Sequence, residues 1–277
     1  MKKLKIISKT LIILMLVFCA FYSTIFVIAK ISSKIDIKNS NSIYMYDKDG
    51  KSFYEGNNGT KKWVKLKDIS KDLVNATIYS EDKNFYNHNG FDIPRIIKSM
   101  FINIKSNDLK QGASTITQQY ARNLFLTFDK TWERKIKEAW YAYKLEVTYS
   151  KDEILEGYLN TINYGNGILG IENASLYYFN KPAKNLTLAE SAMLAGIPKS
   201  PNNYSPLNDE AAAKKRQKEV LQAMVNNKVI TNEKMKDTVS EKLTYYGKKE
   251  NLNLSTIMYY QDAVIKELKE LKVVSDE

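Results

Sequence analysis

The chain has 277 residues, of which 44% are hydrophobic and 12% aromatic, so it can form an ordinary packed core and is not a disordered sequence. Its net charge of +11 favours an anionic partner, such as nucleic acid, acidic lipid headgroups or a phosphorylated substrate, without choosing among them. Its single cysteine, Cys19, and single histidine, His88, exclude a disulfide framework and any site that needs two of either residue.

An apolar stretch near the N-terminus has the composition of a membrane-spanning helix. Leu11–Ala29 contains no charged residue, and its length is about that needed to cross ~30 Å of hydrocarbon as a helix. Residues 1–10 carry four lysines, which favours a cytoplasmic N-terminus and an extracytoplasmic body. The alternative is a cleaved signal peptide, but its apolar part would be shorter, about 7–15 residues, and no Ala-x-Ala site follows. We therefore predict a cytoplasmic basic segment over residues 1–10 and an uncleaved transmembrane helix over residues 11–29.

The rest of the chain divides by composition into three parts. Residues 30–60 are polar and contain turn signals, which predicts a juxtamembrane stalk with a short strand over Ser42–Tyr46. Residues 61–240 are expected to form one mainly α domain, because apolar residues recur there at helical spacing. Residues 241–277 form a C-terminal tail, in which Ile257–Leu271 has the periodicity of a helix.

Capping residues mark several helix starts within the expected domain. The first helix is expected to end at Glu81, and the last to span Glu210–Val225. Capping boxes stand at Ser150-Lys-Asp-Glu153 and Thr187-Leu-Ala-Glu190. Other helices are expected to begin at Asp92, Ser114 and Thr131.

Two adjacent carboxylates stand at the expected end of the first helix. They open the run Glu81-Asp82-Lys-Asn-Phe85-Tyr-Asn-His88-Asn-Gly90. Carboxylates at a helix end are usually solvated surface groups. The functional alternative is that Glu81 is a general base at the lip of a cleft, followed by a turn that Gly90 permits. A lone histidine such as His88 is more often a structural hydrogen-bonding residue than a catalyst.

Polar residues then crowd the start of another helix, behind Gly112. Capping and turn chemistry explains most polar residues at a helix start. A group of this size can also present backbone N–H groups and side-chain hydroxyls to an anion. Arg122 follows one turn later and adds a fixed charge, so a phosphate or diphosphate would fit. The residues concerned are Ser114, Thr115, Thr117, Gln118 and Gln119.

A cationic run follows, from Lys130 to Glu138. Arg134 and Glu138 are spaced i,i+4, so an intrahelical ion pair is the structural explanation. That pair leaves Lys130, Lys135 and Lys137 unexplained. A cationic face with one carboxylate suits a site that binds a diphosphate and positions or deprotonates a second group.

These segments, in this order, resemble the motifs of the family 51 glycosyltransferases, the peptidoglycan polymerases of bacterial cell walls. The family's E-D-x-x-F-x-x-H-x-G is matched from Glu81 to Gly90, and G-x-S-T-I-T-Q-Q from Gly112 to Gln119. R-K-x-x-E is matched from Arg134 to Glu138, and K-x-x-I-L-E-x-Y-L-N from Lys151 to Asn160. A weaker fifth motif would begin with Lys215-Arg216, so that the resemblance covers residues 60–235.

The resemblance implies a mainly α, lysozyme-like, two-lobed glycosyltransferase domain behind one N-terminal transmembrane helix. Its activity would join lipid II units into β-1,4 glycan strands with inversion, releasing undecaprenyl diphosphate. Glu81 would deprotonate the acceptor, and Glu138 would complete the donor site as a second catalytic residue. The residues expected to bind the substrate or its diphosphate are Asp82, Phe85, His88, Gly90, Gly112, Ser114, Thr115, Gln118, Gln119, Arg122, Lys130, Arg134, Lys135 and Asn160.

The resemblance also implies partners. These are lipid II, the nascent glycan chain, membrane lipid and other cell-wall synthesis proteins, with the catalytic domain outside the cell membrane and away from nucleic acid. Mg²⁺ or Mn²⁺ on the substrate diphosphate is expected from the family, with no protein ligands assigned. The family's mobile, membrane-touching region corresponds to Phe101–Lys110, which combines apolar and basic residues. Arg122 stands where Lys is usual and Lys130 where Arg is frequent, which changes the geometry of their hydrogen bonds.

Two alternatives stay open beside the polymerase. A lysozyme-like lytic enzyme would cleave finished peptidoglycan and needs no diphosphate site, whereas a non-enzymatic membrane-anchored scaffold needs no carboxylates at positions 81 and 138. In the tail, Met258–Ile265 resembles the linker that leads into the transpeptidase domain of bifunctional relatives. We expect a monofunctional chain, either natively so or as a shortened relative.

Overall fold

The structure is a computed structural model that describes most of the expected domain and little of the chain on either side. Residues 1–22, most of the stalk and almost all of the tail lie outside it, as does Lys130. Only the end of the expected transmembrane helix is described, as part of a helix over residues 23–31. Within the described part of the chain, no helix is both long and apolar enough to cross a membrane. The described residues are 23–32, 37, 44–46, 52–55, 62–106, 112–125, 131–247 and 267.

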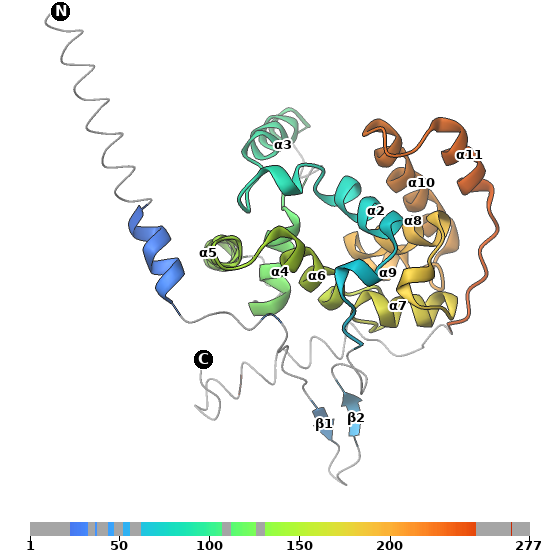
Figure 1. The fold of residues 1–277 in the computed structure, drawn as a ribbon, viewed down its shortest axis with the longest axis horizontal. Coiled ribbons are helices and arrows are strands. Elements are labelled where there is room, and N and C mark those ends of the chain that lie inside the picture. Colours follow the sequence, from blue (N-terminus) through green and yellow to red (C-terminus); the bar gives the residue numbers. More distant parts are fainter. Residues whose placement is uncertain are drawn as a thin grey trace, which may run out of the picture.

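The described part is mainly α, as predicted (Figure 1). A short antiparallel hairpin of β1 (Tyr44–Tyr46) and β2 (Ser52–Glu55) precedes the helices and projects from one edge of the body, which confirms the strand expected in the stalk. The helices are α2 (Lys71–Glu81), α3 (Ile93–Ser106), α4 (Ile116–Phe125), α5 (Trp132–Thr148), α6 (Lys151–Thr161), α7 (Ile171–Phe179), α8 (Leu188–Gly196), α9 (Pro201–Tyr204), α10 (Glu210–Asn226) and α11 (Asn232–Ser240). Short 3₁₀ turns lie at Leu66–Asp68, Phe85–Asn87, Ala183–Asn185 and Ile197–Lys199.

The core consists of two apolar clusters that share helices α2 and α8. In the larger cluster, Leu73 of α2 packs with residues of α4 to α8. In the smaller cluster, Ala76 of α2 and Ala192 of α8 pack with residues of α10 and α11, among them Val220. Every residue of α8 is buried, which explains why this helix is apolar on nearly all sides. Helix α2, which ends at Glu81, is therefore fixed by both clusters.

Local capping chemistry sets most of the helix starts. The capping boxes predicted at Ser150 and Thr187 are both present, and the Thr131 hydroxyl accepts from the Arg134 N–H as a cap should. The start predicted at Ser114 is wrong, because α4 begins at Ile116.

The cap of α4 is Thr115, one residue further along the chain. Its hydroxyl accepts from the Gln118 N–H at 3.2 Å, and the Gln118 side-chain oxygen accepts from the Thr115 N–H at 3.1 Å. This reciprocal pair needs a glutamine or glutamate three residues after the cap. Ser114 has Thr117 at that position, so it cannot form the pair.

Candidate active site

Glu81 lies where four helices converge. It is the last residue of α2, and its side chain is 12% exposed. Its Oε1 accepts from an Arg216 guanidinium nitrogen of α10 at 3.2 Å, and its Oε2 accepts from the Gln119 amide of α4 at 3.1 Å. Its backbone carbonyl accepts from the guanidinium of Arg95 in α3. The carboxylate is thus held by two donors and still reaches the surface.

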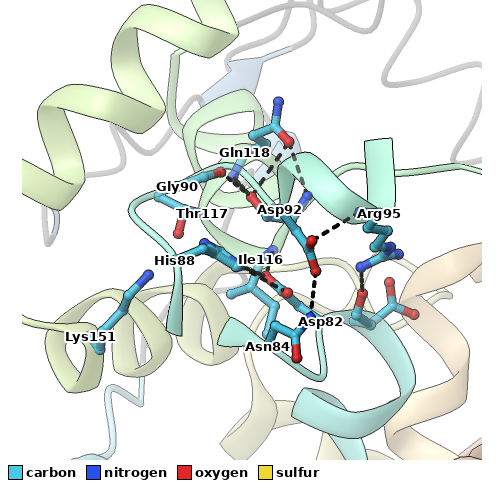
Figure 2. Close-up of polar contacts among 12 residues, drawn as sticks. Asp82, Asn84, His88, Gly90, Asp92, Arg95, Ile116, Thr117, Gln118 and Lys151 are labelled. Atoms are coloured by element: carbon cyan, nitrogen blue, oxygen red, sulfur yellow. Dashed lines mark hydrogen bonds and ion pairs between the residues drawn. The ribbon is translucent and has the colours of Figure 1, made fainter. Parts of the chain in front are cut away.

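Asp82, the next residue, is fully buried and joins three segments (Figure 2). Both of its carboxylate oxygens lie 3.0 Å from His88 Nε2, and Oδ2 also accepts from the Ile116 N–H at 3.0 Å. That N–H belongs to the first turn of α4, where a negative charge is stabilised by the helix dipole. Asp82 therefore sets the position of α4 relative to Glu81.

A second buried carboxylate, Asp92, caps the start of α3 (Figure 2). It accepts from the Arg95 N–H at 3.0 Å and from the Asn84 amide at 2.9 Å. Burial by itself would raise the pKa of Asp92, but these hydrogen bonds and the charges of His88 and Arg95 outweigh it and lower the pKa below its usual value. This carboxylate is thus ionised and fixes α3, which carries Arg95.

The turn at Gly90 connects the first motif to the second. Gly90 has a φ of +84°, which favours glycine, and a Cβ there would lie 3.2 Å from Cγ of Glu146. Its carbonyl accepts from the Thr115 hydroxyl at 2.7 Å. The glycine is therefore needed for both backbone conformation and close packing.

The second carboxylate of interest, Glu138, is buried on α5 with its side chain 1% exposed. It accepts from Arg134 at 2.7 Å, so the i,i+4 pair is present, and from Lys135. Lys135 also donates to the Ser114 hydroxyl at 3.3 Å and is 39% exposed. The segment that starts α4 therefore contacts both carboxylate sites, through Ser114 on one side and Gln119 on the other.

Two further polar side chains lie close to Gln119, one in space and one along the chain. The Tyr158 hydroxyl of α6 donates to Gln119 Oε1 at 3.1 Å. Burial, followed by the negative charge of Glu81, raises the pKa of Tyr158 well above its usual value, so the hydroxyl stays protonated. Arg122 lies about one turn beyond Gln119 on α4, and its buried Nε has no hydrogen-bond partner among the described residues.

A buried ion pair supports the same region from behind. Glu146 of α5 accepts from Lys151 Nζ at 2.7 Å and from the Thr117 hydroxyl at 2.5 Å. The Lys151 ammonium also lies 4.5 Å from the centre of the Phe85 ring, a cation–π distance. This network connects α4, α5 and α6 to the turn after Asp82.

Five of the residues expected to bind substrate have side chains that are almost completely buried. In this structure these side chains contact other parts of the protein. Asn160 is the clearest case, because its amide pairs with both the N–H and the C=O of Val64 at 2.9 Å. The five residues are Asp82, Phe85, Thr115, Gln118 and Asn160.

The other expected residues differ in how far they are exposed. His88 is nearly buried against Asp82, which fits the structural alternative. Gly112 is exposed, with open space around it. The residues with partly exposed polar groups are Glu81, Ser114, Gln119, Arg122, Arg134 and Lys135.

Three residues that contact the site were not predicted from the sequence. Arg216, Arg95 and Tyr158 were not assigned to it, although the first lies in the weak fifth motif and the third in the fourth. For Arg95 no sequence signal pointed to the site.

The described residues do not form a metal site of their own. No group of three or more His, Cys, Asp or Glu side chains within the described ranges could hold a metal ion. Glu81 and Glu138 are moreover already paired with arginine or lysine.

Known proteins resemble this chain over most of its length. The family described as "Transglycosylase" matches residues 49–225. "Penicillin-binding protein 2D" of Bacillus subtilis (strain 168) is 47% identical over 251 residues, covering 90% of this chain and 36% of that protein. "Penicillin-binding protein 1A" of Neisseria lactamica is 41% identical over 226 residues, covering 82% and 28%. A crystal structure of Penicillin-Binding Protein 1A from Haemophilus influenzae aligns with 82% of this chain and 24% of that one, at a TM-score of 0.41 and 22% identity. The chain spans about a third of the length of the curated relatives it matches.

Proposed function

The chain belongs to the transglycosylase family, the family 51 glycosyltransferases, and on that premise we propose that it is a peptidoglycan glycosyltransferase. It polymerises lipid II into β-1,4 glycan strands with inversion and releases undecaprenyl diphosphate. One observation carries the proposal above all: Glu81 is a partly exposed carboxylate that two donors hold in place, and the segment from Ser114 to Gln119 contacts both Glu81 and the cationic site built around Glu138.

In this mechanism Glu81 is the general base. A carboxylate offers about four lone-pair directions, and the contacts with Arg216 and Gln119 occupy two of them. A remaining one accepts the proton of the acceptor's 4-hydroxyl while that oxygen attacks C1 of the donor sugar from the face opposite the diphosphate. The C1–diphosphate bond breaks as the new glycosidic bond forms, which inverts the configuration. A positioned base of this kind contributes on the order of 10²–10⁴-fold.

The diphosphate leaving group binds at the cationic site. Lys135 is partly exposed and already reaches the Ser114 hydroxyl, so it can donate to a phosphate oxygen. Arg122 is a partly exposed cation on the same helix as Gln119, and Arg134 adds charge beside Glu138. Charge-assisted hydrogen bonds to the leaving oxygens stabilise the charge that develops there. Lys130 is proposed to join this set.

The location of the domain is part of the proposal. Leu11–Ala29 is proposed to anchor the chain in the cell membrane with residues 61–240 outside, folded as a two-lobed, lysozyme-like domain with the site between the lobes. The exposed apolar side chains of α3, among them Phe101 and Ile104, are 70% and 75% exposed and would face membrane lipid. Lipid II is itself membrane-bound, so the enzyme and its substrate would meet in two dimensions.

The test is incubation of the purified full-length protein with lipid II alone. We expect long glycan strands from the unmodified protein. Glu81→Gln should lose activity by at least about a hundredfold and keep its binding of lipid II. Glu219→Gln is a matched control, because Glu219 also pairs with Arg216 but is 47% exposed and far less enclosed. Full activity of Glu81→Gln, or shortening of preformed glycan without polymerisation, would refute the proposal.

A further inference from the structure

The side chain of Gln119 bridges two helices at the catalytic carboxylate. Its Nε2 donates to Glu81 Oε2 at 3.1 Å, and its Oε1 accepts from the Tyr158 hydroxyl at 3.1 Å. The hydrogen bonds therefore point in one direction, from Tyr158 through Gln119 to Glu81. The three residues come from α6, α4 and α2.

The direction of these bonds depends on which way the amide faces. The two ends of a glutamine amide have almost the same shape, so only their hydrogen-bond partners decide its orientation. In the opposite orientation Oε1 would face Glu81 Oε2, which places two acceptors against each other while the carboxylate is ionised. The Tyr158 proton would at the same time lose its acceptor, which is costly in a buried position.

Tyr158 is well placed to impose the observed orientation. It is 1% exposed, and the pKa of its hydroxyl is raised by burial, so it is a donor throughout the range in which a carboxylate is ionised. Helix α6 is also held from another side, because Glu156 accepts from the Trp63 indole at 2.8 Å and from the Leu66 N–H at 2.9 Å. The Tyr158 side chain therefore has little freedom to move away from Gln119.

Charged groups from several helices surround Glu81 and Tyr158. Glu81 is faced by Arg216 of α10, and its backbone carbonyl is bound by Arg95 of α3. The charges that act on Tyr158 come from Glu81 and Asp82 on the negative side and from Arg122 on the positive side. Arg216 donates to Oε1 of Glu81. Among the described residues, the Gln119 amide is the side-chain donor to the other carboxylate oxygen, Oε2.

We propose that Tyr158 is a positioning residue for glycosyl transfer, acting through Gln119 to keep a donor on Glu81 Oε2 and so leave a free lone pair directed at the acceptor hydroxyl. This inference rests on the proposed function. Tyr158 itself is buried and does not touch the substrate.

The activity test uses Tyr158→Phe, which removes one oxygen and keeps the ring. We expect kcat for glycan formation to fall by roughly three- to tenfold, the effect of one hydrogen bond, with KM for lipid II unchanged. Tyr120→Phe is the matched control, since Tyr120 is equally buried and its hydroxyl donates instead to the Ile37 carbonyl at 3.1 Å.

A double substitution separates positioning from a general structural effect. In a Gln119→Met background the amide is gone, so Tyr158→Phe should cause no further loss of kcat. Equal effects of Tyr158→Phe in both backgrounds, or equal effects of Tyr158→Phe and Tyr120→Phe, would overturn the inference.

A substrate-free measurement keeps the inference testable if lipid II is not polymerised. In the full-length protein, NMR of the Gln119 side-chain amide should place its protons next to Glu81, and the signal should move or broaden in Tyr158→Phe but not in Tyr120→Phe. An amide that faces Tyr158 with its NH₂ group, or a signal unchanged by Tyr158→Phe, refutes the inference whatever the activity. Absence of polymer from the unmodified protein instead refutes the proposed function.

Discussion

Replacing Lys151 by methionine is expected to destabilise the protein strongly, because it leaves a buried carboxylate without its cation. Glu146 is 6% exposed and accepts from Lys151 at 2.7 Å, whereas the lysine is 18% exposed. After the substitution, the Thr117 hydroxyl would be the remaining donor to Glu146 among the described residues. The change therefore removes one partner of a pair and keeps the desolvation cost of the other.

The magnitude follows from that geometry. Breaking a buried ion pair by removing one partner costs about 3–5 kcal/mol, and the lost cation–π contact with the Phe85 ring adds about 0.5–1 kcal/mol. The partial exposure of Lys151 and the remaining bond from Thr117 argue for the lower end, about 3 kcal/mol in total. For a domain of this size that corresponds to a fall in Tm of roughly 6–12 °C.

The assay is thermal and urea unfolding of the full-length protein, followed by circular dichroism. Lys137→Met is the matched control, because the pair of Lys137 with Glu133 lies on the same helix α5 but is 59% and 78% exposed. We expect the control to change stability by at most about 1 kcal/mol. Glu146→Gln combined with Lys151→Met should recover most of the loss, since no buried charge then remains unpaired. A Lys151→Met protein as stable as the control, or a double variant less stable than either single one, would refute this reasoning.

Three further predictions follow from single contacts. Arg216→Gln should lower kcat for glycan formation with KM for lipid II unchanged, because Glu81 loses the guanidinium that donates to its Oε1 at 3.2 Å; an unchanged kcat in a lipid II assay would contradict this. Asn160→Ala should lower the free energy of unfolding by about 2–3 kcal/mol, because two hydrogen bonds to Val64 are lost, and urea titration should show this with KM for lipid II unchanged. Asp92, whose pKa is lowered in the folded state, stabilises the protein above its unfolded pKa of about 3.9, and this contribution is lost as the pH falls through the folded value. Unfolding of Asp92→Asn should therefore depend less on pH below about 4, and equal pH dependence in both proteins would count against the assigned hydrogen bonds.

Features determined by nearby residues could be predicted from the sequence. The capping boxes at Ser150 and Thr187 depend on residues three positions apart, and the pair of Arg134 with Glu138 depends on a spacing of four. The end of α2 at Glu81 was also predicted. The cap predicted at Ser114 was misplaced by one residue. The choice between neighbouring hydroxyls depends on which of them has a glutamine three residues later.

Features that depend on distant residues could not be predicted in this way. Arg216 contacts Glu81 across 135 positions of sequence, and Asn160 contacts Val64 across 96. A polar side chain that faces substrate and one that binds a neighbouring backbone have the same letter in the sequence. The motif resemblance indicated that Asn160 matters but not that it is buried, and burial is what separates the two roles.

The position of Glu81 at the meeting point of several helices also limits how resistance to an inhibitor could arise. A compound that occupied the acceptor position would contact the carboxylate and the donors around it, Gln119 and Arg216. Each of these side chains also ties its own helix to α2, so a substitution that excluded the compound would disturb the base as well. Escape would have to come from more exposed positions that do not tie a helix to α2.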